Sequence, residues 1–393
     1  MTATAANSAR DEKIRNFLQR QNLRAWIAWR PDELVMMTGC VPHWGASLLV
    51  YFDDVDPLLF VPPIEPREFI PPGLPVRDYP WGVLNCAEPY SFLLTAAAEE
   101  LQSGIRREQV GTNRSSARSA LPIQAAEQIP FPENFSEKIS ALAGQSDAAQ
   151  QSAFLELYLR KTPEDIHAIR LANRIANIGL KVFFEHLQPG MSEVQVASAV
   201  ESAIQCQTGR EDIFHSRGWA MVQSGPNTAD AGRFNRSTGR RLENGDPVLI
   251  ELATCVNGYW SDLTRTAVVG CAIREAEKIL TAVTEARRAP LDVLQPGISA
   301  GEIDAAAWNK VADHGFSAFF THPTGHHVVF RYHDPGFAIA PRESASLEPG
   351  MVITIEPGVY VKDHGAGARI EDNVLLTESG YEVLSRIERS NTA

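Results

Sequence analysis

The sequence has no run of about 18 apolar residues, which is the length that a membrane-spanning helix needs. No apolar segment follows the small, polar stretch at residues 1–10, so a secretory signal is not expected there. Basic residues are fewer than acidic ones, 36 against 48, and the net charge is −12. Binding to nucleic acid needs clustered positive charge. These absences predict a cytoplasmic protein that binds neither membranes nor nucleic acid.

Cysteine is also scarce, with five residues and no C-x-x-C pair. An odd number of widely spaced cysteines favours reduced thiols over disulfides or a cysteine-based zinc site. The hydrophobic fraction of 44% and the charged fraction of 21% are those of an ordinary globular protein. A length of 393 residues exceeds what one hydrophobic core usually spans, so we expect two domains.

The N-terminal part has the pattern of an α/β domain. Short apolar runs at residues 25–29, 47–52 and 58–61 are bounded by Pro, Gly and Asp, as strands would be. The proline-rich segment at residues 62–75 predicts an excursion over the surface rather than a regular element.

After residue 145 the pattern becomes strongly helical. Thr162 followed by Pro163 is typical of a helix start, with threonine as the N-cap and proline at the first helical position. We therefore place the domain boundary near residue 155, which gives domains of residues 1–155 and 156–393.

The second domain contains an internal repeat. The segment L-Q-P-G at residues 187–190 recurs at residues 294–297, and in both copies a hydrophobic residue and a serine follow. Further along, L-E-x-G at residues 242–245 recurs at residues 347–350. Two matched pairs in the same order predict two copies of one structural unit.

Each copy places a carboxylate after an apolar strand. Glu251 follows the run at residues 248–250, and Glu356 follows the run at residues 352–355. If the copies pack about a pseudo-two-fold axis, both carboxylates approach one central cavity. Like charges held close together raise one another's pKa, a cost that is typical of functional sites.

Four segments carry most of the polar residues of this domain. They are residues 251–266, 322–334, 347–360 and 369–373. Each residue alone has an ordinary explanation, since Asp262 could end a strand, the histidines could lie in loops, and Glu371 could lie in a solvated turn. Their joint arrangement on a duplicated frame instead indicates a functional site.

These segments resemble the signature of the pita-bread hydrolases, the family of creatinase, prolidase and aminopeptidase P. The signature reads D-x10-D, then G-H, then M-x4-E-P, then R-x-E-D, and the resemblance covers roughly residues 155–390. Residues 31–39 also resemble the N-terminal domain of creatinase. The resemblance implies an α+β fold, in which a pita-bread catalytic domain with internal pseudo-two-fold duplication follows a smaller α/β domain. It also implies a homodimer whose active site is completed by the partner's N-terminal domain.

Carried over by position, the resemblance gives each polar residue a role. The family's metal ligands fall on Asp262, His326, Glu356 and Glu371, and its substrate-facing histidines fall on His322 and His333. Two positions depart from the pattern: Glu251 stands where the metallopeptidases have Asp, and Gly232 stands where they have His. Two-metal sites need carboxylates placed to within tenths of an ångström. These departures argue against a pair of Mn, Co or Zn ions, so we assign no cofactor.

Within the family the sequence is similar to the ectoine hydrolases, which open a cyclic amidine. A cationic amidine would be attracted by clustered carboxylates. We predict that Glu251 acts as nucleophile or as general base, that Glu356 and Glu371 hold the ring N–H groups, and that His326 transfers the proton. The residues that would bind the substrate are Phe214, Trp219, Trp260, Asp262, His322 and His333.

Two other functions stay open. A metal-dependent Xaa-Pro aminopeptidase or dipeptidase would keep the four ligand positions and accommodate Glu251. A catalytically inactive pita-bread module would serve only to bind another protein, although such modules generally lose the polar cluster that this chain retains.

Overall fold

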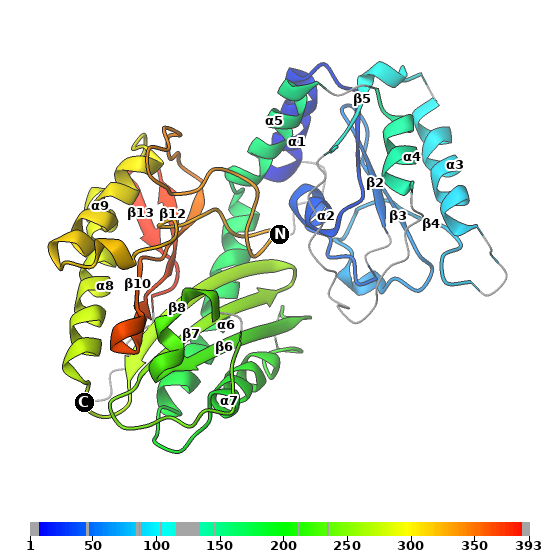
Figure 1. Cartoon of the computed structure of the whole chain (residues 1–393). Helices are drawn as coiled ribbons and strands as arrows, with labels where there is room; N and C mark the ends of the chain where they lie inside the picture. Colours follow the sequence, from blue (N-terminus) through cyan, green and yellow to red (C-terminus); the bar gives the residue numbers. More distant parts are fainter. Residues whose placement is uncertain are drawn as a thin grey trace. The chain divides into compact units, whose positions relative to one another are not determined.

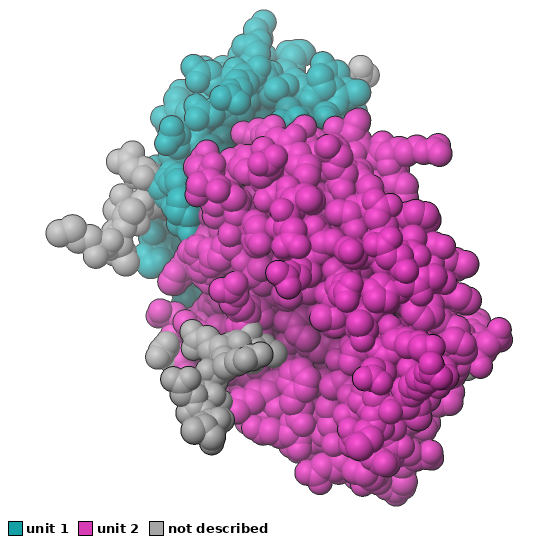
Figure 2. Space-filling model, turned by 90° about the vertical axis from the view of Figure 1, so that its left-hand side faces the viewer, with its two compact units in different colours: residues 1–158, 162–164 teal, residues 159–161, 165–393 magenta. Residues whose placement is uncertain are grey.

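The computed structural model describes residues 8–44, 47–83, 86, 88–102, 104–114, 134–144, 147–210, 212–233 and 236–386. The chain forms two compact units, residues 1–158 with 162–164 and residues 159–161 with 165–393 (Figure 2). The division lies close to the boundary expected near residue 155.

The first unit is built on a five-stranded sheet with the order β4-β3-β2-β1-β5 (Figure 1). Strand β1, next to the central strand β2, runs antiparallel to β2 and parallel to β5. The strands are β1 (Ala25–Ala28), β2 (Leu48–Phe52), β3 (Leu58–Val61), β4 (Val76–Asp78) and β5 (Val110–Thr112). The helices are α1 (Ala9–Arg20), α2 (Pro31–Thr38), α3 (Pro89–Gln102), α4 (Phe135–Leu142) and α5 (Ala148–Leu159). All three strands predicted in this part of the chain are confirmed.

Successive side chains of β1 point to opposite faces of the sheet, and each face carries a hydrophobic core. Ile27 points toward the layer of α3 and α4, where it belongs to the same buried cluster as Leu93 and Ile139. Trp26 points to the other face and stacks on Phe154 of α5, with ring centroids 4.4 Å apart. Both faces of the sheet are therefore covered by helices, as in other α/β domains.

The second unit contains two similar halves, each with a helix pair and a three-stranded antiparallel sheet. The first half comprises α6 (Pro163–Glu185), α7 (Glu193–Gln205), β6 (Ser216–Ser224), β7 (Pro247–Val256) and β8 (Tyr259–Val268). The second half comprises α8 (Arg274–Val293), α9 (Ala300–Asp313), β9 (Val352–Ile355), β12 (Asp372–Thr377) and β13 (Gly380–Val383). The sheet orders are β6-β7-β8 and β13-β12-β9, and a separate hairpin pairs β10 (Gly358–Val361) with β11 (Ala366–Arg369).

The sequence repeat corresponds to a repeated set of hydrogen bonds. The Gly190 N–H donates to the Leu242 carbonyl at 2.8 Å, and the Gly297 N–H donates to the Leu347 carbonyl at the same distance. The next serine of each copy then caps α7 or α9 in a capping box. The two L-x-P-G turns and the two L-E-x-G turns are thus paired in the same way in both halves.

The strands after these turns differ in length, so Glu251 and Glu356 occupy different positions relative to their strands. Glu251 was expected to follow its strand, but β7 continues to Val256 and places Glu251 in its interior. All ten residues of β7 are buried because the strand lies between β6 and β8. Strand β9 ends at Ile355, so Glu356 comes directly after it, as expected.

The start of α6, the cysteines and the character of the helices were also predicted from the sequence. Helix α6 begins at Pro163, as predicted. The five cysteines, Cys40, Cys86, Cys206, Cys255 and Cys271, are all free. Within the described part of the chain, no helix combines the length and apolar character that a membrane crossing requires.

The buried Glu33 of α2 makes the first unit sensitive to pH. Burial raises its pKa to about 7, although it accepts a hydrogen bond from Asn113 and lies 3.6 Å from Arg30. Because the folded state binds this proton more tightly than the unfolded chain does, the stabilisation is complete below about pH 4.5 and is lost as the pH rises through about 7.

We expect Glu33→Gln to remove this pH dependence, because the amide stays uncharged. Between about pH 5 and about pH 8, the free energy of local unfolding of the wild type should fall by on the order of 2 kcal/mol relative to the variant. Amide hydrogen exchange of β1 and β5 measures this difference. Glu137→Gln, at an exposed position of α4, is the matched control. Parallel pH profiles for the wild type and Glu33→Gln would contradict the prediction.

Candidate active site

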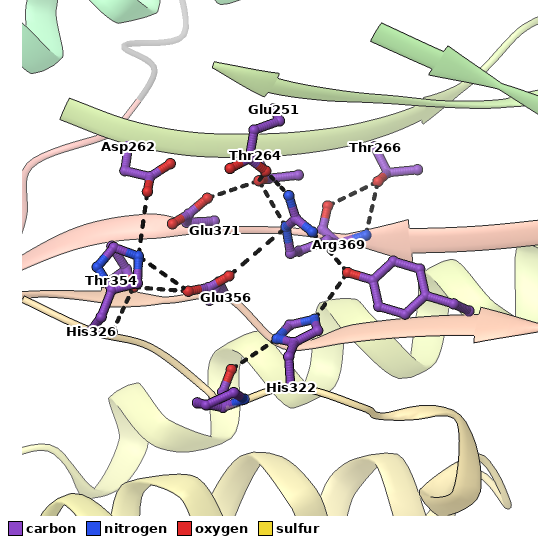
Figure 3. Close-up of polar contacts among 12 residues, drawn as sticks. Glu251, Asp262, Thr264, Thr266, His322, His326, Thr354, Glu356, Arg369 and Glu371 are labelled. Atoms are coloured by element: carbon purple, nitrogen blue, oxygen red, sulfur yellow. Dashed lines mark hydrogen bonds and ion pairs between the residues drawn. The ribbon is translucent and has the colours of Figure 1, made fainter. Parts of the chain in front are cut away.

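A cavity of about 370 Å³ lies within the second unit, between residues of both halves. Glu251 enters it from β7, Glu356 from the end of β9, and Arg369 from the end of β11 (Figure 3). Its lining residues are Ala231, Glu251, His322, Pro323, Gly325, His326, His333, Ala338, Glu356 and Arg369. The structure therefore brings the two carboxylates of the sequence repeat into one compartment.

Two further carboxylates lie behind this lining. Asp262 projects from β8 and Glu371 directly precedes β12, and each is 1% exposed. The His326 Nε2 atom lies 3.4 Å from both Asp262 Oδ2 and Glu356 Oε1. His333 is more exposed, and its Nε2 atom lies 3.9 Å from Asp262 Oδ2. Six residues predicted from the sequence thus converge: Glu251, Asp262, His326, His333, Glu356 and Glu371.

Glu251 is bound by three residues that were not predicted as site residues. Thr264 lies opposite Glu251 in the β7–β8 register, and its Oγ1 atom is 2.9 Å from Glu251 Oε2. Arg369 forms an ion pair with the same oxygen, and the Tyr332 hydroxyl donates to Oε1. One signal was available in the sequence, because residues two apart in a strand share a face and Thr264 is two residues from Asp262.

His322 belongs to a hydrogen-bonded chain that leads to Arg369. Its Nδ1 atom lies 2.9 Å from the Pro323 carbonyl oxygen, which can only accept, so Nδ1 carries the proton. Its Nε2 atom therefore accepts from the Tyr360 hydroxyl at 2.9 Å, and Arg369 donates to that hydroxyl oxygen at 2.9 Å. Burial lowers the pKa of His322, which keeps this imidazole neutral at pH 7.

The cluster holds more acidic than basic side chains. Burial, together with the charges of Glu371 and Glu356, raises the pKa of Asp262 well above its usual range. Burial and the charge of Glu371 do the same for Glu356. Arg369 is the guanidinium that lines the cavity, so four carboxylates share one positive charge there.

The donor set suits a divalent cation. Asp262 Oδ1 and Glu371 Oε1 are buried without a hydrogen-bond partner, which is costly for a carboxylate unless a cation is bound. Potential ligand atoms of His326, Glu356 and Glu371 all lie within 4.8 Å of one another. The same holds for Asp262 with His326 and His333, and for Glu251 with Asp262 and Glu371. Carboxylate and imidazole ligands are those that Zn and Mn accept.

The predicted aromatic residues lie outside the lining of this cavity. Trp219 stacks on Trp260 with centroids 5.2 Å apart, and Trp260 lies 6.3 Å from the ring of Tyr332. Phe214 precedes β6, and its backbone N–H donates to Asn257. Trp260 is thus linked to the site through Tyr332.

Gly232, where the family pattern has a histidine, lies in the 3-10 helix η4 (Ala231–Arg233). Among the described residues, a Cβ atom added there would meet Asp230 Oδ1 at 3.4 Å. Packing therefore does not require glycine at this position, and the preceding Ala231 lines the cavity.

Comparisons with known proteins agree with this architecture. The model of Metallopeptidase family M24 matches residues 167–378. The Xaa-Pro dipeptidase of Pyrococcus furiosus is 32% identical over 269 residues, which cover 68% of this chain and 74% of that protein. The Xaa-Pro dipeptidase of Pyrococcus horikoshii is also 32% identical, over 60% of this chain and 64% of that protein. Neither of these relatives is named an ectoine hydrolase.

Solved structures show the same fold across both units. The prolidase from Pyrococcus horikoshii superposes with a TM-score of 0.75 and 24% identity, covering 97% of this chain and 99% of that chain. The prolidase from Pyrococcus furiosus superposes with a TM-score of 0.72 and 25% identity, covering 95% and 100%. The predicted fold, a small α/β domain followed by a pita-bread domain, is confirmed. With the family model matched across residues 167–378, the chain belongs to the M24 metallopeptidase family of hydrolases.

Proposed function

We propose that this chain hydrolyses the amide bond of short Xaa-Pro peptides with the help of a divalent cation. One observation carries the proposal: the buried, unpaired oxygens of Asp262 and Glu371 beside His326 and Glu356. The naming of the relatives as Xaa-Pro dipeptidases supports the substrate class. In this proposal the function that we predicted second, a metal-dependent peptidase, takes precedence over ectoine hydrolysis.

Asp262, His326, Glu356 and Glu371 would hold the cation. The chemistry supplied by such a group is polarisation of the scissile carbonyl and acidification of water. Glu356 lines the cavity and lies next to His326, so its carboxyl group is placed to pass a proton to the leaving nitrogen.

Two histidines on the cavity wall would bind and orient the peptide. The proton of His322 is held at Nδ1 by the Pro323 carbonyl, which presents the ring in one fixed orientation. The ring of His333 stacks on Tyr332 with centroids 4.7 Å apart, and its side chain is exposed. The imidazole of His322, which is neutral at pH 7, would contact the substrate through a hydrogen bond rather than through charge.

A second candidate is hydrolysis of the cyclic amidine ectoine. It is favoured by the position of Glu251 and Glu356 on the wall of one cavity, where they would attract a cationic ring. Glu251 would attack the amidine carbon or activate water there. Its ion pair with Arg369 lowers its nucleophilicity, which is why we place this candidate second.

The two candidates differ in their need for metal. We expect chelator-treated protein to be inactive on Ala-Pro and Leu-Pro, and to release proline, detected by mass spectrometry, once Mn²⁺ or Co²⁺ is restored. Cleavage of ectoine by the metal-free protein would instead establish the second candidate. Failure on both substrates, with and without metal, would favour the inactive binding module.

We expect His326→Ala to lower kcat/KM for Xaa-Pro cleavage by about 10³-fold, because the imidazole contacts both Asp262 and Glu356. Steady-state kinetics on the metal-loaded protein measures this loss. His167→Ala, at an exposed position of α6, is the control and should keep wild-type kinetics. A loss of less than about tenfold for His326→Ala would remove this residue from the mechanism.

The homodimer implied by the family resemblance remains a prediction. Sedimentation velocity should give a single species with twice the mass of the 43.2 kDa chain. A monomer with full activity would show that no partner subunit completes the site.

A further inference from the structure

The carboxylates of the acid cluster differ in how their oxygens are bound. Both oxygens of Glu251 are occupied, Oε1 by the Tyr332 hydroxyl and Oε2 by Thr264 and Arg369. Asp262 and Glu371 each keep one buried oxygen without a hydrogen-bond partner. Arg369 therefore pairs directly with Glu251, whereas one oxygen each of Asp262 and Glu371 has no donor.

Thr264 increases this difference. Its hydroxyl lies 2.9 Å from Glu251 and 2.8 Å from Glu371, while Arg369 Nε donates to its oxygen at 3.0 Å. A hydroxyl group has one proton, so it can serve only one of the two carboxylates at a time. Glu251 keeps its ion pair with Arg369 in either case, whereas the Oε1 atom of Glu371 stays unpaired.

Arg369 also opposes a cation at Glu251. Its guanidinium is 5% exposed and is held by the Tyr360 hydroxyl at 2.9 Å and by Thr264 at 3.0 Å. An ion bound by Glu251 would lie within a few ångströms of this fixed positive charge, in surroundings that screen it poorly. Arg369 lies farther from Glu356, whose Oε2 atom is 4.0 Å from Arg369 Nε.

We propose that the active site holds a single divalent cation, bound by Asp262, His326, Glu356 and Glu371. Arg369 and Tyr332 keep Glu251 out of the coordination sphere, and the guanidinium takes the place of a second cation. This inference rests on the cation binding of the proposed function and specifies its stoichiometry and the role of Glu251.

Counting bound metal tests the proposal without any substrate. The full-length protein is stripped with a chelator and titrated with MnCl₂, and free Mn²⁺ is followed by electron paramagnetic resonance. We expect saturation at one Mn²⁺ per chain, with a bound-state spectrum of isolated ions. Saturation at two ions with the spectrum of a coupled pair would overturn the proposal, and so would the absence of binding.

The same substitution, Glu to Gln, at two positions then distinguishes a cation ligand from the ion-pair partner of Arg369. Glu371→Gln should weaken Mn²⁺ binding at least about tenfold, because it removes a charged ligand. Glu251→Gln should leave one Mn²⁺ per chain with its Kd changed by less than about threefold. Equal losses in both variants would contradict the assignment of Glu251 as the partner of Arg369.

Glu371 is buried, so its variant could fail to fold, and circular dichroism checks this. Glu356→Gln provides a second substitution at a proposed ligand, at a less buried position, and should also weaken binding at least about tenfold. The proposed peptidase activity can fail while the metal count stays at one. Conversely, a count of two would leave Xaa-Pro cleavage intact, so the two failures are distinguishable.

Discussion

Three buried carboxylates and the half-buried Glu356, gathered near the guanidinium of Arg369, are the constraint on which the rest of the second unit depends. Removing a carboxylate from water costs several kcal/mol unless opposite charge or hydrogen bonds replace the solvent. For Glu251, the ion pair with Arg369 replaces the solvent, and Thr264 and Tyr332 contribute hydrogen bonds. Asp262 and Glu371 each keep one buried oxygen without a hydrogen-bond partner, so the site is suited to a cation. Charge balance, rather than the shape of the cavity, therefore gives the site its chemical character.

The duplicated frame brings these acidic groups together, but the corresponding strands of its two halves differ in length. Glu251 lies in the interior of a ten-residue strand that has a neighbour on each side, so its backbone position is fixed. Glu356 follows the four-residue strand β9, and its side chain faces the cavity. This difference makes Glu251 an ion-pair partner of Arg369, while we propose Glu356 as a ligand of the cation.

A buried ion pair outside the cavity supports the segment that carries Tyr332 and His333. Asp334 accepts hydrogen bonds from the backbone N–H groups of Phe330 and Arg331 at 3.0 and 2.8 Å. Its other oxygen lies 3.0 Å from Lys161 Nζ, and both side chains are fully buried. Such a pair adds little net stability, but breaking it leaves an uncompensated buried charge. The pair thus restrains the loop and the direction in which Tyr332 and His333 point.

Much of this architecture depends on patterns that are local in the chain. Runs of apolar residues between Pro, Gly and Asp are enough to place β1, β2 and β3, and Thr162-Pro163 is enough to start α6, because strand and helix signals act over a few residues. The repeated turns indicate the duplicated frame, and the resemblance to the family signature points to Asp262, His326, Glu356 and Glu371.

Contacts between residues far apart in the sequence required the folded structure. The length of β7, and hence the interior position of Glu251, depends on its pairing with β6 and β8. The predicted aromatic wall did not reach the cavity lining, because side-chain direction depends on how sheets and loops pack. The binding of Glu251 by Arg369 and Tyr332 joins residues more than 80 positions apart, a distance over which local pattern carries no information.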